Sequence, residues 1–152
     1  MNKKKKKVLA IASAGGHWIE LLRIRPAFSA FHVVYVSTNK SNAHEVQGYE
    51  FHHIANATRK SVWNFFIMFF QLLGLILKIR PKVIVTTGSA PGLMAIAVGK
   101  LCMVKTVWIE SISSVDEPSA SGKNARFFAD LYLTQWKHLE REKGPKYKGS
   151  IL

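Results

Sequence analysis

Three short polar segments of this sequence contain glycine, serine, histidine and glutamate residues that could bind a phosphate and transfer a proton. They are residues 13–17 (SAGGH), residues 87–92 (TGSAPG) and residues 110–114 (ESISS). Gly15 and Gly16 lack a Cβ, so the backbone there can turn sharply and come close to a ligand. The free N–H groups at the start of a helix that follows such a turn favour an anion, typically a phosphate. The simpler alternative is that the two glycines only close a turn between a strand and a helix.

Two familiar phosphate-binding loops are missing from the sequence. The Gly-x-Gly-x-x-Gly pattern of dinucleotide-binding folds is not met, because residues 16–20, after Gly15, read GHWIE. The Gly-Lys-Ser/Thr of P-loop ATPases does not occur either. The glycine turn at residues 13–17 is therefore of another kind.

The hydrophobic pattern predicts the elements that must position these segments. Residues 8–12 form a short apolar run before the first turn, and residues 18–24 show a helical pattern that Pro26 limits. Strands that alternate with helices predict an α/β fold, with a Rossmann-like parallel sheet flanked by helices. Further strands are expected at residues 33–37, 51–55, 82–87, 106–110 and 131–134. Further helices are expected at 43–47, 62–77, 93–103 (with Pro91 suited to the first helical position) and 125–129.

Each of the three polar segments follows one of these predicted strands. In an open α/β sheet the carboxyl ends of the strands lie along one edge, and ligands bind at that edge. We therefore expect the three segments to converge on one cleft.

The composition indicates one strongly basic domain. A chain of 152 residues can bury a sizeable core in one domain. Its 22 Lys and Arg against 9 acidic residues give a formal net charge of +13, which implies an anionic partner such as nucleic acid, phospholipid headgroups or a phosphorylated substrate. The single cysteine, Cys102, excludes an internal disulfide and is compatible with a reducing compartment. Residues 1–7 are interpreted as a basic lead-in, because the apolar run after them is too short for an export segment.

Residues 62–77 (VWNFFIMFFQLLGLIL) form the most apolar segment of the chain. As a helix this segment would be about 24 Å long, which is short of the ~30 Å hydrocarbon core of a bilayer, so a spanning helix is not expected. Asn64, Gln71 and Lys78 are spaced seven apart and line one narrow polar stripe, which leaves more apolar surface than packing on a sheet needs. We expect the surplus to contact a membrane interface, and the alternative is that a protein partner covers it. The membrane-contacting residues would be Trp63, Phe65, Phe66, Phe69 and Phe70, with Arg59, Lys60, Lys78, Arg80 and Lys82 touching anionic headgroups at the ends.

Two other function classes fit part of this pattern. The charge of +13 could mark a nucleic-acid-binding module. However, the positive residues are spread from Lys3 to Lys148, and the aromatic residues gather in one apolar segment instead of alternating with basic ones. The first glycine turn could also serve a stand-alone nucleotide- or flavin-binding α/β protein.

Five segments resemble, in their order along the chain, one protein family. They are SAGGH (13–17), TGSAPG (87–92), WIES (108–111), FADLYLTQW (128–136) and YKGSIL (147–152). The family is the membrane-anchoring subunit of the two-part UDP-N-acetylglucosamine transferase of the dolichol pathway, with its bacterial capsule and exopolysaccharide counterparts. More distantly, the glycine turns are similar to those in the N-terminal half of the peptidoglycan transferase that makes lipid II.

The resemblance implies a fold equivalent to the N-terminal half of a GT-B glycosyltransferase. It implies a subunit that binds a lipid-pyrophosphate-linked saccharide at the membrane and recruits a second subunit, which carries the UDP-sugar site. A complete two-domain GT-B enzyme would need roughly twice this chain, so we expect this chain alone to be inactive or nearly so. Neither a metal nor another cofactor is implied, and no nucleic acid is expected as a partner.

The resemblance also implies roles for individual residues. Gly15 and Gly16 would hold the pyrophosphate of the acceptor, and His17 would be the base that takes a proton from the acceptor hydroxyl. A cap or a hydrogen-bond donor to phosphate is the alternative role for His17. Glu110 is the alternative base or a sugar-hydroxyl acceptor, unless it only caps the end of its strand. Further phosphate or sugar contacts are expected from Ser13, Arg59, Gly88, Ser89, Gly92 and Ser111.

We expect a single acceptor-binding domain over residues 1–152, located at the cytoplasmic face of a membrane. The eukaryotic members of the resembled family carry an N-terminal membrane span, whereas this sequence passes from its lysines directly into the first strand. Membrane association is therefore expected to depend on the apolar helix at residues 62–78 and on the basic surface, which includes a basic tail at residues 137–152.

Overall fold

The computed structural model describes residues 5–57 and 61–151, and within these ranges it contains one seven-stranded sheet. The strand order is β3-β2-β1-β4-β5-β6-β7, and every pair of neighbours is parallel. The strands are β1 (Lys7–Ala12), β2 (His32–Ser37), β3 (Glu50–His53), β4 (Val83–Thr86), β5 (Lys105–Ile109), β6 (Leu131–Thr134) and β7 (Lys146–Tyr147).

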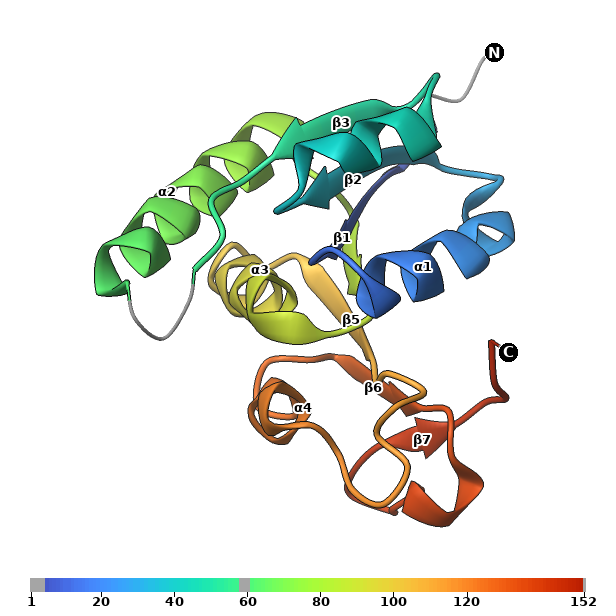
Figure 1. Cartoon of the computed structure of the whole chain (residues 1–152). Helices are drawn as coiled ribbons and strands as arrows, with labels where there is room; N and C mark the ends of the chain where they lie inside the picture. The colour runs from blue at the N-terminus through green and yellow to red at the C-terminus, as the bar shows by residue number, and fades with distance from the viewer. Residues whose placement is uncertain (1–4, 58–60, 152) are drawn as a thin grey trace.

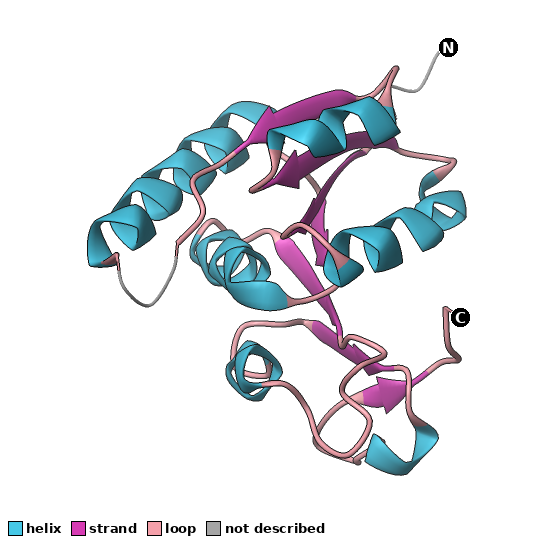
Figure 2. Ribbon diagram, viewed as in Figure 1, coloured by secondary structure: helices cyan, strands magenta, loops and turns pink. Residues whose placement is uncertain are grey.

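Helices cover both faces of this sheet (Figures 1 and 2). The α-helices are α1 (Gly16–Arg23), α2 (Val62–Ile79), α3 (Ser89–Leu101) and α4 (Ala120–Ala125), and the 3-10 helices are η1 (Arg25–Phe28), η2 (Lys40–Val46) and η3 (Lys137–Leu139). Figure 1 shows α1 on one side of the sheet and α2, α3 and α4 on the other. The molecule is therefore a three-layer α/β/α domain, as the alternation of strands and helices predicts.

Alternate residues of the central strand β1 face two separate cores. Leu9 and Ile11 pack in the core under α2, α3 and α4, whereas Val8, Ala10 and Ala12 pack in the core under α1. All five are at most 1% exposed. A strand covered on both faces reads as a continuous apolar run, which explains why this strand is recognisable in the sequence.

Helix α2 packs on the sheet through one face only. Met68, Leu72 and Ile76 are buried in the core. Two residues of the predicted polar stripe bind backbone groups of the preceding segment. Gln71 accepts a hydrogen bond from the N–H of Ala55 (2.8 Å), and Asn64 donates one to the carbonyl of Asn56 (3.1 Å). The two amides therefore satisfy the backbone of the segment that connects β3 to α2, where no strand partner is available.

Two predictions about the C-terminal third are wrong. The short helix expected at residues 125–129 begins at Ala120 and ends at Ala125, because the side chain of Ser119 caps it by accepting a hydrogen bond from the N–H of Gly122 (2.9 Å). The strand at Leu131–Thr134 is not the last one, since β7 pairs with it inside the segment interpreted as a basic tail. A strand of two residues has too little hydrophobic pattern to be recognised.

The start of α3 also differs from the prediction. The helix begins at Ser89, so Pro91 is its third residue and not its first. Proline is tolerated there because the N–H groups of the first turn have no partner within the helix.

Candidate functional site

Two of the three polar segments meet at the centre of the sheet. The turn after β1 and the turn after β4 lie side by side, because β1 and β4 are hydrogen-bonded neighbours. The chain then leaves in opposite directions, since α1 covers one face of the sheet and α3 the other. This is the point at which the strand order reverses, and in open α/β sheets ligands bind outside the strand ends at such a point.

Hydrogen bonds lock these two turns together. The hydroxyl of Thr87 donates to the carbonyl of His17 (2.6 Å), and the N–H of Ser13 donates to the hydroxyl of Ser89 (3.3 Å). In return, Nδ1 of His17 lies 3.0 Å from the carbonyl oxygen of Thr87. The sequence prediction that residues 13–17 and 87–92 converge is therefore met by direct contact.

The contact with Thr87 determines which nitrogen of His17 is available for chemistry. A backbone carbonyl can only accept a hydrogen bond, so the proton of the neutral imidazole is on Nδ1. Nε2 then carries the free lone pair. A histidine held in this way by a carbonyl is oriented to accept a proton at Nε2.

The backbone of Gly88 forms the surface on which the His17 ring lies. A Cβ at Gly88 would be 2.8 Å from Cε1 and 2.9 Å from Nδ1 of His17, and the backbone has a φ of +124°. Glycine is required here both for this close approach and for the left-handed backbone.

We expect Gly88→Ala to displace the imidazole and to lower about 100-fold the rate of a reaction in which His17 takes the proton, because a misplacement near 1 Å can cost that much in catalysis. The measurement is kcat together with the thermal midpoint of unfolding. Gly48→Ala is the matched control, since Gly48 also has a positive φ (+87°) but a Cβ there meets nothing within 4 Å. A similar loss of kcat in both variants would contradict a specific role for the contact with His17.

Two helix N-termini lie next to His17. Gly15 is the N-cap of α1 and Gly88 that of α3, and neither makes a side-chain cap hydrogen bond. Gly15 and Gly16 are exposed, and a Cβ at either of them meets nothing within 4 Å. Backbone N–H groups at such N-termini attract anions. The exposed turn at Gly15 and Gly16 is therefore accessible to an anion, with the half-buried Ser89 beside it.

Glu110 has a different environment from the one expected of a base. Its side chain is 2% exposed and lies in a network of donors at the end of β5. Oε2 accepts hydrogen bonds from Trp108 Nε1 (3.0 Å) and the Tyr132 hydroxyl (2.8 Å), while Oε1 accepts from the Ser114 hydroxyl (3.1 Å) and the Ser119 N–H (3.2 Å). Burial and the negative charge of Glu110 raise the pKa of Tyr132, which keeps its hydroxyl protonated as a donor. This geometry favours a structural role for Glu110, which was the simpler reading of its sequence position.

A second buried carboxylate ties the third polar segment to α1. Glu20 is 5% exposed and accepts hydrogen bonds from the Ser111 hydroxyl (2.7 Å), from Gln135 Nε2 (3.0 Å) and from the N–H of Ile112 (3.4 Å). Ser111 is therefore buried at the end of β5, where its hydroxyl is engaged by α1. Glu20 is not predicted as a buried residue from the sequence, because an acidic residue in a helix is usually exposed. The sequence feature that points to its burial is its position between two apolar residues, Ile19 and Leu21.

The remaining predicted contacts are Gly92 and Arg59. Gly92 is buried in the first turns of α3 against the side chain of Thr86, which a Cβ would overlap, so it allows the helix to pack on β4. Arg59 lies outside the described residues. Within residues 5–57 and 61–151, no cluster of three or more His, Cys, Asp and Glu side chains could hold a metal ion.

The aromatic residues of α2 divide into two groups. Trp63, Phe66 and Phe70 are 78%, 55% and 64% exposed, whereas Phe65 and Phe69 are half-buried against the core. Ile67 and Leu77 extend the exposed apolar face along the helix. In the described part of the chain, α2 is the single helix that is long and apolar enough to cross a membrane, judged by length and composition alone. It extends to Ile79, two residues beyond the segment that the sequence predicts to be too short for a span. Because its other face belongs to the core of the sheet, it can offer one side to a membrane surface without leaving the fold.

Comparisons with known proteins agree with this architecture. The family model described as "Oligosaccharide biosynthesis protein Alg14 like" matches residues 8–151. Two curated relatives are both named "UDP-N-acetylglucosamine transferase subunit ALG14". The one from Mus musculus is 28% identical over 183 residues, covering 96% of this chain and 83% of the relative. The one from Homo sapiens is 26% identical over 181 residues, covering 95% and 82%.

Solved structures with the same fold are about twice as long. The crystal structure of Acinetobacter baumannii MurG superposes with a TM-score of 0.77 at 11% identity, covering 93% of this chain and 45% of MurG. The UDP-N-acetylglucosamine 2-epimerase from Rickettsia bellii gives 0.73 at 13% identity, covering 97% and 45%. The chain thus spans less than half of these structures. The predicted Rossmann-like fold, equivalent to one half of a GT-B protein, is confirmed.

Proposed function

The chain belongs to the family of Alg14-like oligosaccharide biosynthesis proteins, and we propose that it is the acceptor-binding, membrane-associating subunit of a split GT-B glycosyltransferase. It is a glycosyltransferase subunit that acts with a partner in lipid-linked oligosaccharide synthesis, as the names of its mouse and human relatives indicate. The family membership does not favour the nucleic-acid-binding or flavin-binding alternatives. The observation that supports the acceptor role is the pairing of His17 with two helix N-termini that lack a side-chain cap, at the reversal point of the sheet.

The proposed reaction moves a sugar from a UDP-sugar to a saccharide linked to a lipid diphosphate. The second subunit supplies the UDP-sugar. The acceptor hydroxyl oxygen attacks C1 of the sugar, the bond between C1 and the UDP oxygen breaks, and UDP leaves with that electron pair. Nε2 of His17 takes the proton of the hydroxyl, while Nδ1–H stays bonded to the carbonyl of Thr87.

The backbone would hold the diphosphate of the acceptor during this transfer. The N–H groups at the start of α1, next to Gly15 and Gly16, and those at the start of α3, next to Ser89, face the same edge. Fixing the diphosphate at this edge places the saccharide beside His17, and such positioning is a large part of the rate gain in a two-substrate reaction.

Membrane association would depend on the exposed face of α2. Trp63, Phe66 and Phe70 form an apolar surface of the kind that enters the headgroup boundary of a bilayer. Helix α2 begins on the side of the sheet where the strands end, because it connects β3 to the parallel strand β4. Its N-terminal end therefore lies toward the edge that would hold the acceptor. We propose, separately, that the membrane surface in question is the cytoplasmic one.

The deciding experiment is reconstitution with the second subunit. We expect co-expression of the two chains to produce sugar transfer to a lipid-diphosphate-linked saccharide, measured with a panel of UDP-sugars. Each chain alone should be inactive or nearly so. Full activity of this chain by itself would overturn the division of sites between two subunits.

A further inference from the structure

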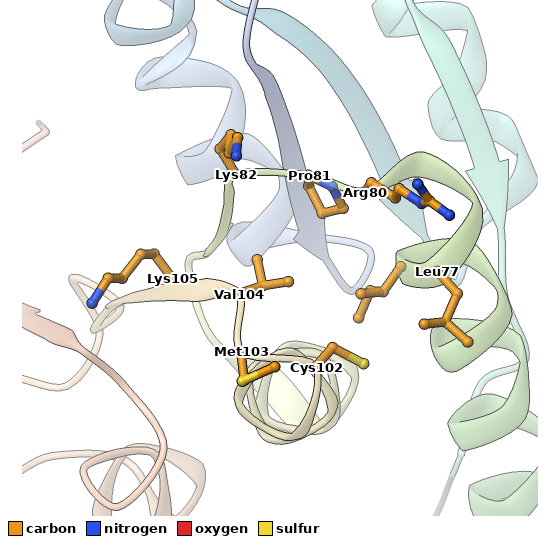
Figure 3. Close-up of a pocket in the computed structure, with 9 residues that line it drawn as sticks. Leu77, Arg80, Pro81, Lys82, Cys102, Met103, Val104 and Lys105 are labelled. Carbon is orange, nitrogen blue, oxygen red and sulfur yellow. The ribbon is translucent and has the colours of Figure 1, made fainter.

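A basic pocket lies at the edge of the sheet where the strands begin, opposite the edge with His17. It has a volume of about 480 Å³ and is enclosed by the ends of α2 and α3 and the starts of β4 and β5 (Figure 3). Arg80 follows α2, Lys82 precedes β4, and Lys105 opens β5. Figure 3 shows these cations around the rim, with Arg80 and Lys105 on opposite sides of Val104 and Met103.

The charge around this pocket has one sign. Among the residues that the structure describes, no acidic side chain lines it, and the adjoining hollow is lined by four more cations, Lys5, Lys6, Lys7 and Lys78. None of these seven side chains forms an ion pair in the part of the chain that the structure describes. Unpaired cations gathered at one edge create a positive potential over that surface, which attracts an anionic partner.

Apolar side chains project from the same edge. Met103 is 93% exposed, Leu101 73% and Leu77 57%. Leu77 and Met103 line the pocket directly. Exposed apolar side chains among unpaired cations are typical of a surface that binds a bilayer, because the apolar side chains contact the acyl chains and the cations contact the anionic headgroups. A nucleic acid or a free anion would contact only the cations.

The backbone at this edge has a conformation that side chains rarely adopt. Arg80 and Met103 have φ values of +51° and +56°, each just after the helix that it ends. Glycine is the usual residue at such a position. Left-handed non-glycine residues carry strain and cluster at ligand-binding sites. Two of them line one pocket here, one with a cation and one with an apolar side chain.

We infer that this pocket binds anionic phospholipid headgroups of the bilayer on which α2 lies. The inference rests on the proposed membrane association and adds a second contact to it, at the opposite end of the 18-residue helix. Arg80, Lys82 and Lys105 contact lipid phosphates, and Met103 and Leu77 enter the interface beside them. Anchoring at both ends keeps α2 parallel to the membrane surface, which holds the His17 edge level with the headgroups.

The test compares vesicle binding of three proteins. These are the wild type, the variant Arg80→Gln/Lys82→Gln/Lys105→Gln, and the control Lys123→Gln/Lys137→Gln/Lys143→Gln, which loses the same charge in the C-terminal third. All six replaced residues are exposed, so the variants are expected to fold. Sedimentation is measured with phosphatidylcholine vesicles with and without 30% phosphatidylglycerol. At about fivefold per cation, the first variant should bind the anionic vesicles about 100-fold more weakly, and the control less than tenfold more weakly.

A fluorescent probe locates the contact. An environment-sensitive dye is attached at Met103→Cys in a Cys102→Ser background, and its emission should shift to the blue on anionic vesicles. The same dye at Phe127→Cys, an exposed position after α4, should not respond. Equal shifts at the two positions, or none at Met103→Cys, would overturn the inference.

Additional variants and an added anion distinguish a failure of the headgroup site from a failure of the proposed membrane association. If the triple variant at the pocket binds like the wild type while Phe66→Ser/Phe70→Ser loses binding to both vesicle types, the headgroup site is wrong and the membrane association stands. If the wild type binds neither vesicle type, both are wrong. Inorganic phosphate is added against sodium chloride of equal ionic strength. If it displaces the protein more than the salt does, the pocket takes free phosphate and the lipid assignment is overturned.

Discussion

Replacing His17 with alanine is expected to lower the kcat of the assembled two-subunit enzyme by about 10²–10⁴-fold, the usual contribution of a general base. The expectation follows from the bond between Nδ1 and the carbonyl of Thr87, which leaves Nε2 as the proton acceptor. The measurement is sugar transfer at saturating UDP-sugar and acceptor. Vesicle binding should not change, because His17 lies at the end of the sheet away from the basic pocket.

Two further variants give this prediction its controls. His44→Ala removes an exposed histidine of η2 and should leave turnover near that of the wild type. His17→Gln keeps a hydrogen-bond donor at the site but cannot take a proton near neutral pH. If His17→Gln retained turnover, the side chain would be a donor to the acceptor phosphate and not the base.

Glu110→Ala is expected to destabilise the fold by about 4 kcal/mol, because it leaves buried donors without an acceptor and each such donor costs about 1–3 kcal/mol. Those donors are Trp108 Nε1, the Tyr132 hydroxyl, the Ser114 hydroxyl and the Ser119 N–H. Chemical denaturation of the purified chain measures the loss. Glu110→Gln should lose less, since its remaining carbonyl oxygen can still accept and the Tyr132 hydroxyl can accept from its amide.

The kinetics of the same variants separate the two roles of Glu110. A structural carboxylate predicts that Glu110→Gln, where it folds, keeps most of the turnover of the wild type. A Glu110→Gln enzyme with unchanged stability and a kcat lowered as far as in His17→Ala would assign Glu110 to the proton transfer instead.

The fold could be predicted from the sequence because its central strands are buried on both faces. Residues 8–12 and 33–37 are nearly continuous apolar runs, and they coincide with β1 and β2 to within one residue at each end. The alternation with helices then leaves a parallel sheet as the consistent arrangement. The prediction failed for α4 and β7, which are six and two residues long. Elements of that size depend on tertiary contacts such as those of Gly122 with Glu110 and Tyr132.

The candidate site could be predicted only in part. The edge was recognisable because the glycine turns follow strands, and the contact between His17 and Thr87 supports that reasoning. The roles of Glu110 and Ser111 could not be read from sequence, because they depend on burial. Both side chains are engaged inside by partners as distant in sequence as Glu20 and Tyr132. A carboxylate at the end of a strand has the same sequence pattern whether it faces solvent or the interior.

The direction of α2 has a consequence for how substrates would travel. As the crossover between two parallel strands, this helix runs antiparallel to the sheet. With α2 resting flat on the bilayer, the strands also lie along the membrane plane, and their carboxyl ends open sideways. A lipid-linked saccharide would then arrive by lateral diffusion within its own leaflet, without lifting its tail into water. The soluble nucleotide sugar would approach from the aqueous side, so the two reactants would not compete for one entrance.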